Sequence, residues 1–192
     1  MNLRLRIFLI ALLSLTMIQG CAPLIIAGGA TAAAAARDRR TVGAFVDDGA
    51  IELKTGRAIR MDPMLKGKVH INVTSMNGIV LLSGEAPTSS LRDLVLKQAR
   101  TVQGIRRIVN EVRISPPTSL GSRSKDTWLT TKVKGKMVST KNLDATRVKV
   151  VTENKVVYLM GLVKRREGEL ATEAARSVKG VQRVVKLFEY ID

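Results

Sequence analysis

The sequence predicts an α+β protein in which two tandem units share the order α-β-β-α-β. A pattern repeats after about 70 residues, and each copy contains the signature of a β-hairpin. A connector with two prolines and a glycine, residues 115–122, separates the copies. We therefore expect each unit to pack two helices on a small mixed three-stranded sheet.

Each copy opens with a predicted helix that begins at an aspartate, Asp48 or Asp126. Aspartate is a favoured N-cap because its side chain accepts hydrogen bonds from free N–H groups of the first turn. Apolar or small side chains follow at a spacing of about four residues, which places them on one helical face. These side chains are Ile51, Thr55 and Ile59 in copy one and Leu129, Val133 and Met137 in copy two.

A β-hairpin is predicted after each first helix. Asn77-Gly78 separates two apolar, β-branched segments in copy one, and Asn154-Lys155 takes the same place in copy two. Asn-Gly favours a tight turn whose residues need positive φ. The expected strands cover residues 71–74 and 79–84 in the first copy and 148–151 and 156–161 in the second.

A second helix follows each hairpin and ends near a glycine, Gly104 or Gly180. Glycine at this place is typical of a left-handed C-terminal cap. The last predicted strands are residues 108–114 and 184–191. The apolar side chains that share one face of each helix are Leu94, Val95, Ala99 and Val102 in copy one and Leu170, Ala171, Ala175 and Val178 in copy two.

The N-terminal segment is typical of a cleavable signal peptide. Arg4 and Arg6 precede a mostly apolar stretch at 7–18, and small Gly20 stands before the only cysteine, Cys21. The apolar stretch is shorter than the roughly 20 residues that a membrane-spanning helix needs. The segment resembles a bacterial lipobox, which implies that Cys21 becomes the acylated first residue of the mature chain. An ordinary signal peptide followed by a free thiol is the alternative.

These features divide the chain into five predicted parts. They are a signal peptide at 1–20, a lipidated tether at 21–46, a first unit at 47–114, the connector at 115–122 and a second unit at 123–192. Residue 22 is alanine rather than aspartate, which favours sorting to the outer membrane of the cell envelope in the lipoproteins that the lipobox resembles.

The charge balance favours a polyanionic partner. The chain has 32 lysines and arginines against 16 aspartates and glutamates, a net charge of +16. Acidic lipid, lipopolysaccharide and nucleic acid all meet this condition. Aromatic residues, which stack on bases, make up only 3%, and a secreted protein does not meet nucleic acid in its normal compartment, so we expect no nucleic-acid partner.

The sequence indicates no enzyme, metal site or cofactor. His70 is the only histidine and has no cysteine to join it as a ligand, which favours a structural role. Asp47-Asp48 resembles a carboxylate pair, but helix capping already explains Asp48. The motifs of a serine nucleophile, a zinc site or a nucleotide cofactor are absent from the sequence.

The ordered set of motifs resembles the BON domain: the leading aspartate, the Asn-Gly turn, strands that end at Gly84 or Gly161, and a small helix closed by glycine. Two such units behind a lipobox resemble the dual-BON outer-membrane lipoproteins. The resemblance implies a non-catalytic protein on the periplasmic face of the outer membrane. It further implies binding of anionic phospholipid through the second unit, support of envelope integrity and enrichment at division sites.

The first helix of copy two carries features that copy one lacks. The sole tryptophan, Trp128, takes the place of Ala50 and is surrounded by lysines. It lies about 100° around the helix from Leu129, at the edge of the core or outside it. An indole beside lysines suits a membrane interface. The resemblance implies lipid contact by Trp128, Leu129, Lys132, Val133, Lys134 and Val138.

Two alternatives remain open at this stage. In the first, Trp128 packs against the other unit or the connector, and the lysines are only a solvated face. The basic surface of the second unit would then serve an envelope protein or peptidoglycan, and Lys164-Arg165-Arg166 is the segment best placed for such a partner.

Overall fold

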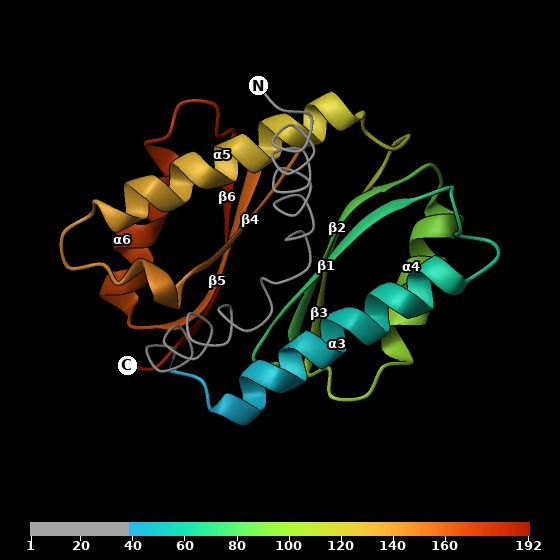
Figure 1. The fold of residues 1–192 in the computed structure, drawn as a ribbon, viewed down its shortest axis with the longest axis horizontal. Coiled ribbons are helices and arrows are strands. Elements are labelled where there is room, and N and C mark those ends of the chain that lie inside the picture. Colours follow the sequence, from blue (N-terminus) through green and yellow to red (C-terminus); the bar gives the residue numbers. More distant parts are fainter. Residues whose placement is uncertain (1–38) are drawn as a thin grey trace, which may run out of the picture. The chain divides into compact units, whose positions relative to one another are not determined.

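The computed structural model describes residues 39–192 (Figure 1). The predicted signal peptide, Cys21 and most of the tether lie outside the described residues. Within residues 39–192, none of the helices has the length and apolar character that a membrane crossing requires.

The first unit has the predicted order of elements. Its strands form a sheet of order β1-β2-β3, with β1 antiparallel and β3 parallel to the central β2, so the sheet is mixed. The elements are α3 (Val42–Met61), β1 (His70–Met76), β2 (Ile79–Ala86), α4 (Ser89–Arg100) and β3 (Arg107–Ile114).

The second unit repeats this arrangement, with one short 3-10 turn added before its first strand. The sheet order is β4-β5-β6, and β5 pairs antiparallel with β4 and parallel with β6. The predicted α+β class and the α-β-β-α-β order are confirmed. The elements are α5 (Leu120–Val138), η2 (Ala145–Arg147), β4 (Lys149–Glu153), β5 (Val156–Val163), α6 (Arg165–Arg176) and β6 (Arg183–Tyr190).

Each unit has its own core between its helices and one face of its sheet. The three-residue stripes predicted for the first helices are buried in both copies. Val80 and Leu82 of β2 face the first core, and Val157 and Leu159 of β5 face the second. The helical periodicity of the sequence therefore identified the correct inner faces.

Both first helices begin earlier than predicted, so the assignment of Asp48 and Asp126 as N-caps was wrong. Thr41 caps α3, with its Oγ1 accepting from Ala44 N at 3.1 Å. Ser119 caps α5, with its Oγ accepting from Ser122 N at 3.3 Å. The helices therefore take up residues that we had assigned to the tether and the connector.

The two aspartates instead hold the hairpin turns. Buried Asp48 accepts hydrogen bonds from Asn77 N at 2.6 Å and Gly78 N at 2.9 Å. Buried Asp126 accepts from Asn154 N and Lys155 N, both at 2.9 Å. All four turn residues have positive φ, as the turn prediction required. Each aspartate thus joins its first helix to a turn about 30 residues later, which satisfies N–H groups that would otherwise be buried without a partner.

Gly104 and Gly180 have φ of 88° and 108°, which confirms the predicted left-handed conformation. They do not cap the second helices directly, because α4 and α6 already end at Arg100 and Arg176. Each glycine closes one further turn. A Cβ at Gly104 would lie 3.4 Å from Ile51 Cδ1, so the turn packs closely against α3.

The remaining sheet faces pack against each other. Met76, Ile79 and Leu81 of the first unit form one buried cluster with Tyr158 and Met160 of the second. Both faces of the central strands are therefore covered, and all eight residues of β2 are buried. This contact joins the two units through apolar side chains.

Tyr158 should make the joined units sensitive to high pH. Burial raises the pKa of Tyr158 to about 12, and Glu111, which accepts a hydrogen bond from its hydroxyl at 3.2 Å, adds to the rise. The unfolded chain loses this proton near pH 10, whereas the folded chain keeps it, so stability falls between about pH 10 and 12. We expect this loss to reach about 2 to 3 kcal/mol. Urea unfolding across this range measures it. The free energy of unfolding should fall less steeply with pH in Tyr158→Phe than in the parent. An equal slope in both proteins would show that Tyr158 is not the cause.

Candidate lipid-binding surface

The outward side of α5 carries large apolar side chains that contact no core. Leu120, Trp128 and Val138 are 77%, 64% and 74% exposed. The exposure of Trp128 agrees with its predicted offset from the core stripe. It also rules out the alternative that Trp128 is buried against the first unit within residues 39–192. Leu120 was missed because we had placed it in the connector.

Lysines border this apolar row on both sides. Lys132 Nζ lies 3.7 Å from the centroid of the Trp128 ring and donates to Lys179 O at 2.9 Å. The cation–π contact and the hydrogen bond together hold the ammonium beside the indole. Lys134 is exposed, and helical geometry places it on the opposite edge of the row. Lys125 and Lys136 are exposed on the same edge as Lys132.

Two members of the predicted contact set need correction. Leu129 is 4% exposed and Val133 is fully buried, because both belong to the core stripe of α5. They hold the helix on its sheet and do not offer their side chains to a ligand. The accessible part of the predicted set is Trp128, Lys132, Lys134 and Val138, to which the structure adds Leu120. We call these five residues the α5 surface.

The second basic segment, Lys164-Arg165-Arg166, is exposed, and the side chains of Arg165 and Arg166 make contacts within the protein. Lys164 N donates to Glu167 Oε2 at 2.8 Å, and the Arg165 guanidinium lies 5.0 Å from the Tyr190 ring. Arg166 pairs with Glu169 at 3.3 Å, an exposed pair whose contribution to stability is small. Two of the three positive side chains of Lys164-Arg165-Arg166 therefore have a partner within the protein.

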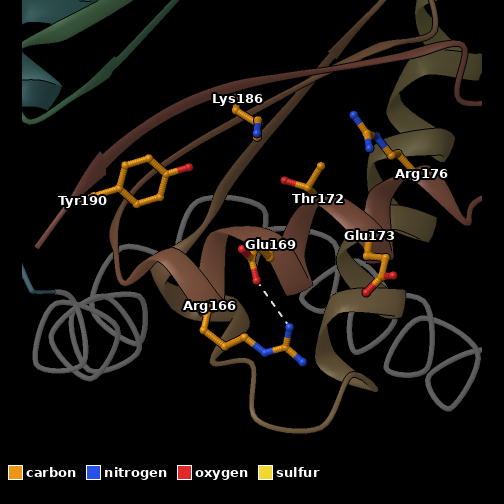
Figure 2. Close-up of a pocket in the computed structure, with 7 residues that line it drawn as sticks. All are labelled: Arg166, Glu169, Thr172, Glu173, Arg176, Lys186 and Tyr190. Carbon is orange, nitrogen blue, oxygen red and sulfur yellow. Dashed lines mark hydrogen bonds and ion pairs between the residues drawn. The ribbon is translucent and has the colours of Figure 1, made fainter. Parts of the chain in front are cut away.

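A hollow of about 330 Å³ lies beside this segment (Figure 2). Its wall mixes charges of both signs, so it offers no clear selectivity for an anion. The lining residues are Arg166, Glu169, Thr172, Glu173, Arg176, Lys186 and Tyr190.

Glu167, in the first turn of α6, accepts hydrogen bonds from two arginines. Arg39, at the start of the described chain, binds both carboxylate oxygens at 2.6 and 3.0 Å. Arg147 Nη1 donates to Oε1 at 2.7 Å. Partial burial opposes ionisation of Glu167, but the bonds from Arg39, from Lys164 N and from Arg147 outweigh it and lower the pKa of this carboxyl.

Comparisons with known proteins agree with the repeat. The BON domain model matches residues 47–116 and 125–192. The outer membrane lipoprotein DolP of Haemophilus influenzae is 41% identical over 175 residues, 91% of each chain. The 21 kDa hemolysin of Actinobacillus pleuropneumoniae is 38% identical over 154 residues, covering 80% of this chain and 79% of that one. Osmotically-inducible protein Y of Escherichia coli is 30% identical over 146 residues, covering 74% of this chain and 72% of that one. The chain therefore belongs to the BON-domain family, with two BON domains in tandem, and is a DolP-like outer-membrane lipoprotein.

Proposed function

We propose that this lipoprotein is non-catalytic and binds anionic phospholipid on the periplasmic face of the outer membrane through the α5 surface. The observation that carries the proposal is the exposed Trp128 with the Lys132 ammonium held over its ring. Support of envelope integrity and enrichment at division sites belong to the same proposal, and they rest on the family resemblance rather than on the geometry of α5.

The chemistry of the α5 surface suits the boundary between lipid headgroups and acyl chains. An indole ring prefers this depth because one part of it is apolar and its N–H is polar. Each basic residue near an anionic surface adds about 1 kcal/mol. Leu120 and Val138 extend the apolar row, so α5 can lie along the membrane with its lysines at the headgroups.

A weak headgroup site is sufficient if the chain is also acylated at Cys21, as we propose. The acyl anchor keeps the domains at the membrane, so the α5 surface acts at high effective concentration. Its contribution is then the choice of lipid rather than attachment itself.

Vesicle binding by a soluble fragment of residues 22–192 tests this function. We expect a blue shift of Trp128 fluorescence with anionic vesicles, reversed by high salt because exposed charges are screened. In vesicle sedimentation, Lys134→Ala should weaken binding about fivefold, the equivalent of about 1 kcal/mol. Trp128→Ala should weaken it further.

Lys97→Ala is the matched control, since Lys97 is an exposed helical lysine of the first BON domain. It should leave binding almost unchanged. Equal binding to zwitterionic vesicles would contradict the proposal, as would a dominant protein adduct at Trp128 after crosslinking in intact cells.

A further inference from the structure

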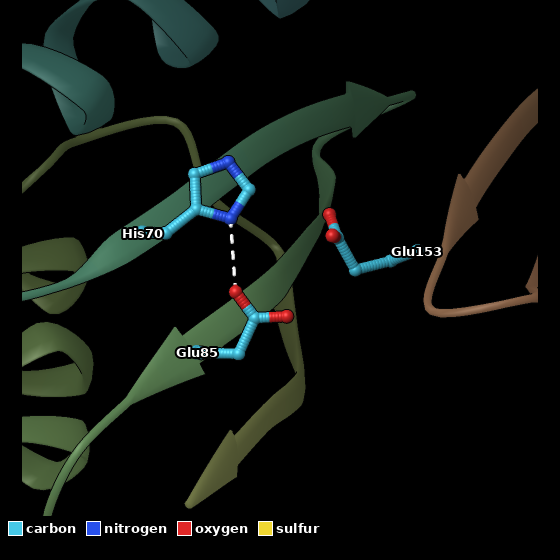
Figure 3. A group of neighbouring side chains, drawn as sticks. All are labelled: His70, Glu85 and Glu153. Atoms are coloured by element: carbon cyan, nitrogen blue, oxygen red, sulfur yellow. Dashed lines mark hydrogen bonds and ion pairs between the residues drawn. The ribbon is translucent and has the colours of Figure 1, made fainter. Parts of the chain in front are cut away.

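A buried polar cluster lies where the two BON domains meet (Figure 3). His70 begins β1 and Glu85 lies opposite it on β2, both in the first domain. Glu153 ends β4 in the second domain. One potential ligand atom from each side chain lies within 4.8 Å of the other two.

The two carboxylates of this cluster are deeply buried. Glu85 is 0% and Glu153 is 4% exposed. His70 Nδ1 lies 3.0 Å from Glu85 Oε2, and the His70 side chain is 16% exposed. Two carboxylates from different domains thus share a site with a single imidazole, which is cationic only when it is protonated.

Neutral groups supply the other hydrogen bonds to these carboxylates. Asn72 Nδ2 donates to Glu153 Oε2 at 2.6 Å, and Asn154 Nδ2 donates to Glu85 Oε1. The N–H and hydroxyl of Thr118 donate to Glu85, each at 3.2 Å. Burying two carboxylates close together is costly when they are charged, and a bound cation would remove part of that cost.

Ser83 provides a second, separate observation. Its residue is 1% exposed, and its Oγ has no hydrogen-bond partner within the part of the chain that the structure describes. Ser83 lies two residues before Glu85 on β2 and opposite Asn72 on β1, so strand alternation places it on the same sheet face as the cluster. A buried hydroxyl of this kind is free to bind a water that completes the coordination of an ion.

The cluster is also accessible from outside. A hollow of about 410 Å³ opens beside it, and His70, Asn72, Arg123, Asp126 and Glu153 are among its lining residues. The hollow reaches His70 and Glu153, and Glu85 lies behind them.

We propose that His70, Glu85 and Glu153 bind one divalent transition-metal ion that bridges the two BON domains. One imidazole nitrogen and two carboxylate oxygens suit Zn²⁺ or Mn²⁺, with water in the remaining positions. Ligands about 2.0 to 2.2 Å from a tetrahedral ion stand roughly 3.3 to 3.6 Å apart, so three atoms that lie within 4.8 Å of one another would approach by up to about 1.5 Å on binding. The ion takes the unprotonated nitrogen of the neutral imidazole and replaces the His70–Glu85 hydrogen bond.

Calorimetric titration of the full chain in detergent, first stripped with EDTA, tests the site with ZnCl₂ and with MnCl₂. We expect one ion per chain for at least one of the two metals. A hundredfold excess over Kd should raise Tm by roughly 5 to 10 °C. Glu153→Gln and His70→Arg should abolish both effects.

His70→Arg supplies a permanent positive charge but no metal ligand. If this variant folds but no longer responds to metal, the response of the parent requires the imidazole nitrogen and not merely a positive charge. Glu173→Gln, an exposed carboxylate outside the cluster, is the matched control and should bind like the parent. Binding that persists in Glu153→Gln would overturn the proposal. A Tm that varies with pH but not with metal would overturn it too, by showing that only protons occupy the site.

Discussion

Gly84→Ala is expected to destabilise the first BON domain by about 3 to 6 kcal/mol, from backbone strain and steric overlap combined. A Cβ at Gly84 would lie 2.0 Å from the carbonyl oxygen of His70, and the φ of Gly84 is +114°. The obstructing atom belongs to the backbone of the paired strand β1, so relief requires the sheet itself to move. Gly161 shares the steric part of this constraint but not the positive φ, since its Cβ would lie 2.4 Å from Arg147 O.

Urea unfolding followed by circular dichroism measures the effect. Gly135→Ala is the matched control, because Gly135 lies in α5 with nothing within 4 Å of an added Cβ. That variant should be more stable than the parent by about 0.5 to 1 kcal/mol, from helix propensity alone. A Gly84→Ala protein of parental stability would show that the approach of β1 to β2 is looser than described.

Asp48→Ala should cost about 3 to 5 kcal/mol because it removes a buried charged acceptor from a network. Ser75 Oγ donates to Asp48 at 2.6 Å, in addition to the two N–H groups of the hairpin turn. Arg40 Nη1 lies 2.5 Å from the same carboxylate. Loss of Asp48 leaves buried donors of the turn unsatisfied. Asp47→Ala changes the exposed neighbouring aspartate and should alter stability by less than about 0.5 kcal/mol.

The same carboxylate should contribute to acid sensitivity. Burial favours its neutral form, but hydrogen bonds from Gly78, Ser75, Asn77 and Arg40 outweigh burial and lower the pKa of Asp48. A lowered folded-state pKa adds stability above the unfolded value of about 3.9 that is lost as pH falls below it. The free energy of unfolding, measured from pH 5 down to pH 2, should fall less steeply in Asp48→Asn than in the parent. Parallel curves would assign the acid sensitivity to other carboxylates.

Local patterns predicted the elements of this fold but not the contacts between distant ones. Helical spacing and Asn-Gly identified the helices and hairpins, because both depend on neighbouring residues. Asp48 and Asp126 were misassigned because a helix cap and a turn acceptor require the same side chain, and the partner turn is far away in sequence. The packing of sheet on sheet had one unused signal: residues 79–82 are continuously apolar rather than alternating, which is typical of a strand buried on both faces.

The candidate sites followed the same division. The exposure of Trp128 could be predicted from one step of helical rotation, whereas Leu120 required the true start of α5. The cluster of His70, Glu85 and Glu153 could not be predicted, because its carboxylates belong to different domains and meet only when the two sheets pack.

The double ion pair at Glu167 gives the chain a particular response to force. Arg39 stands at the N-terminal end of the described chain, yet its guanidinium is held by the second BON domain. Arg147, from the 3-10 turn of the second domain, pairs with the same carboxylate. Tension applied through residues before 39 would meet the Arg39–Glu167 pair on α6 together with the Arg40–Asp48 pair on α3. The second domain would then share the mechanical load of the tether with the first domain, although only the first domain follows the tether directly in sequence.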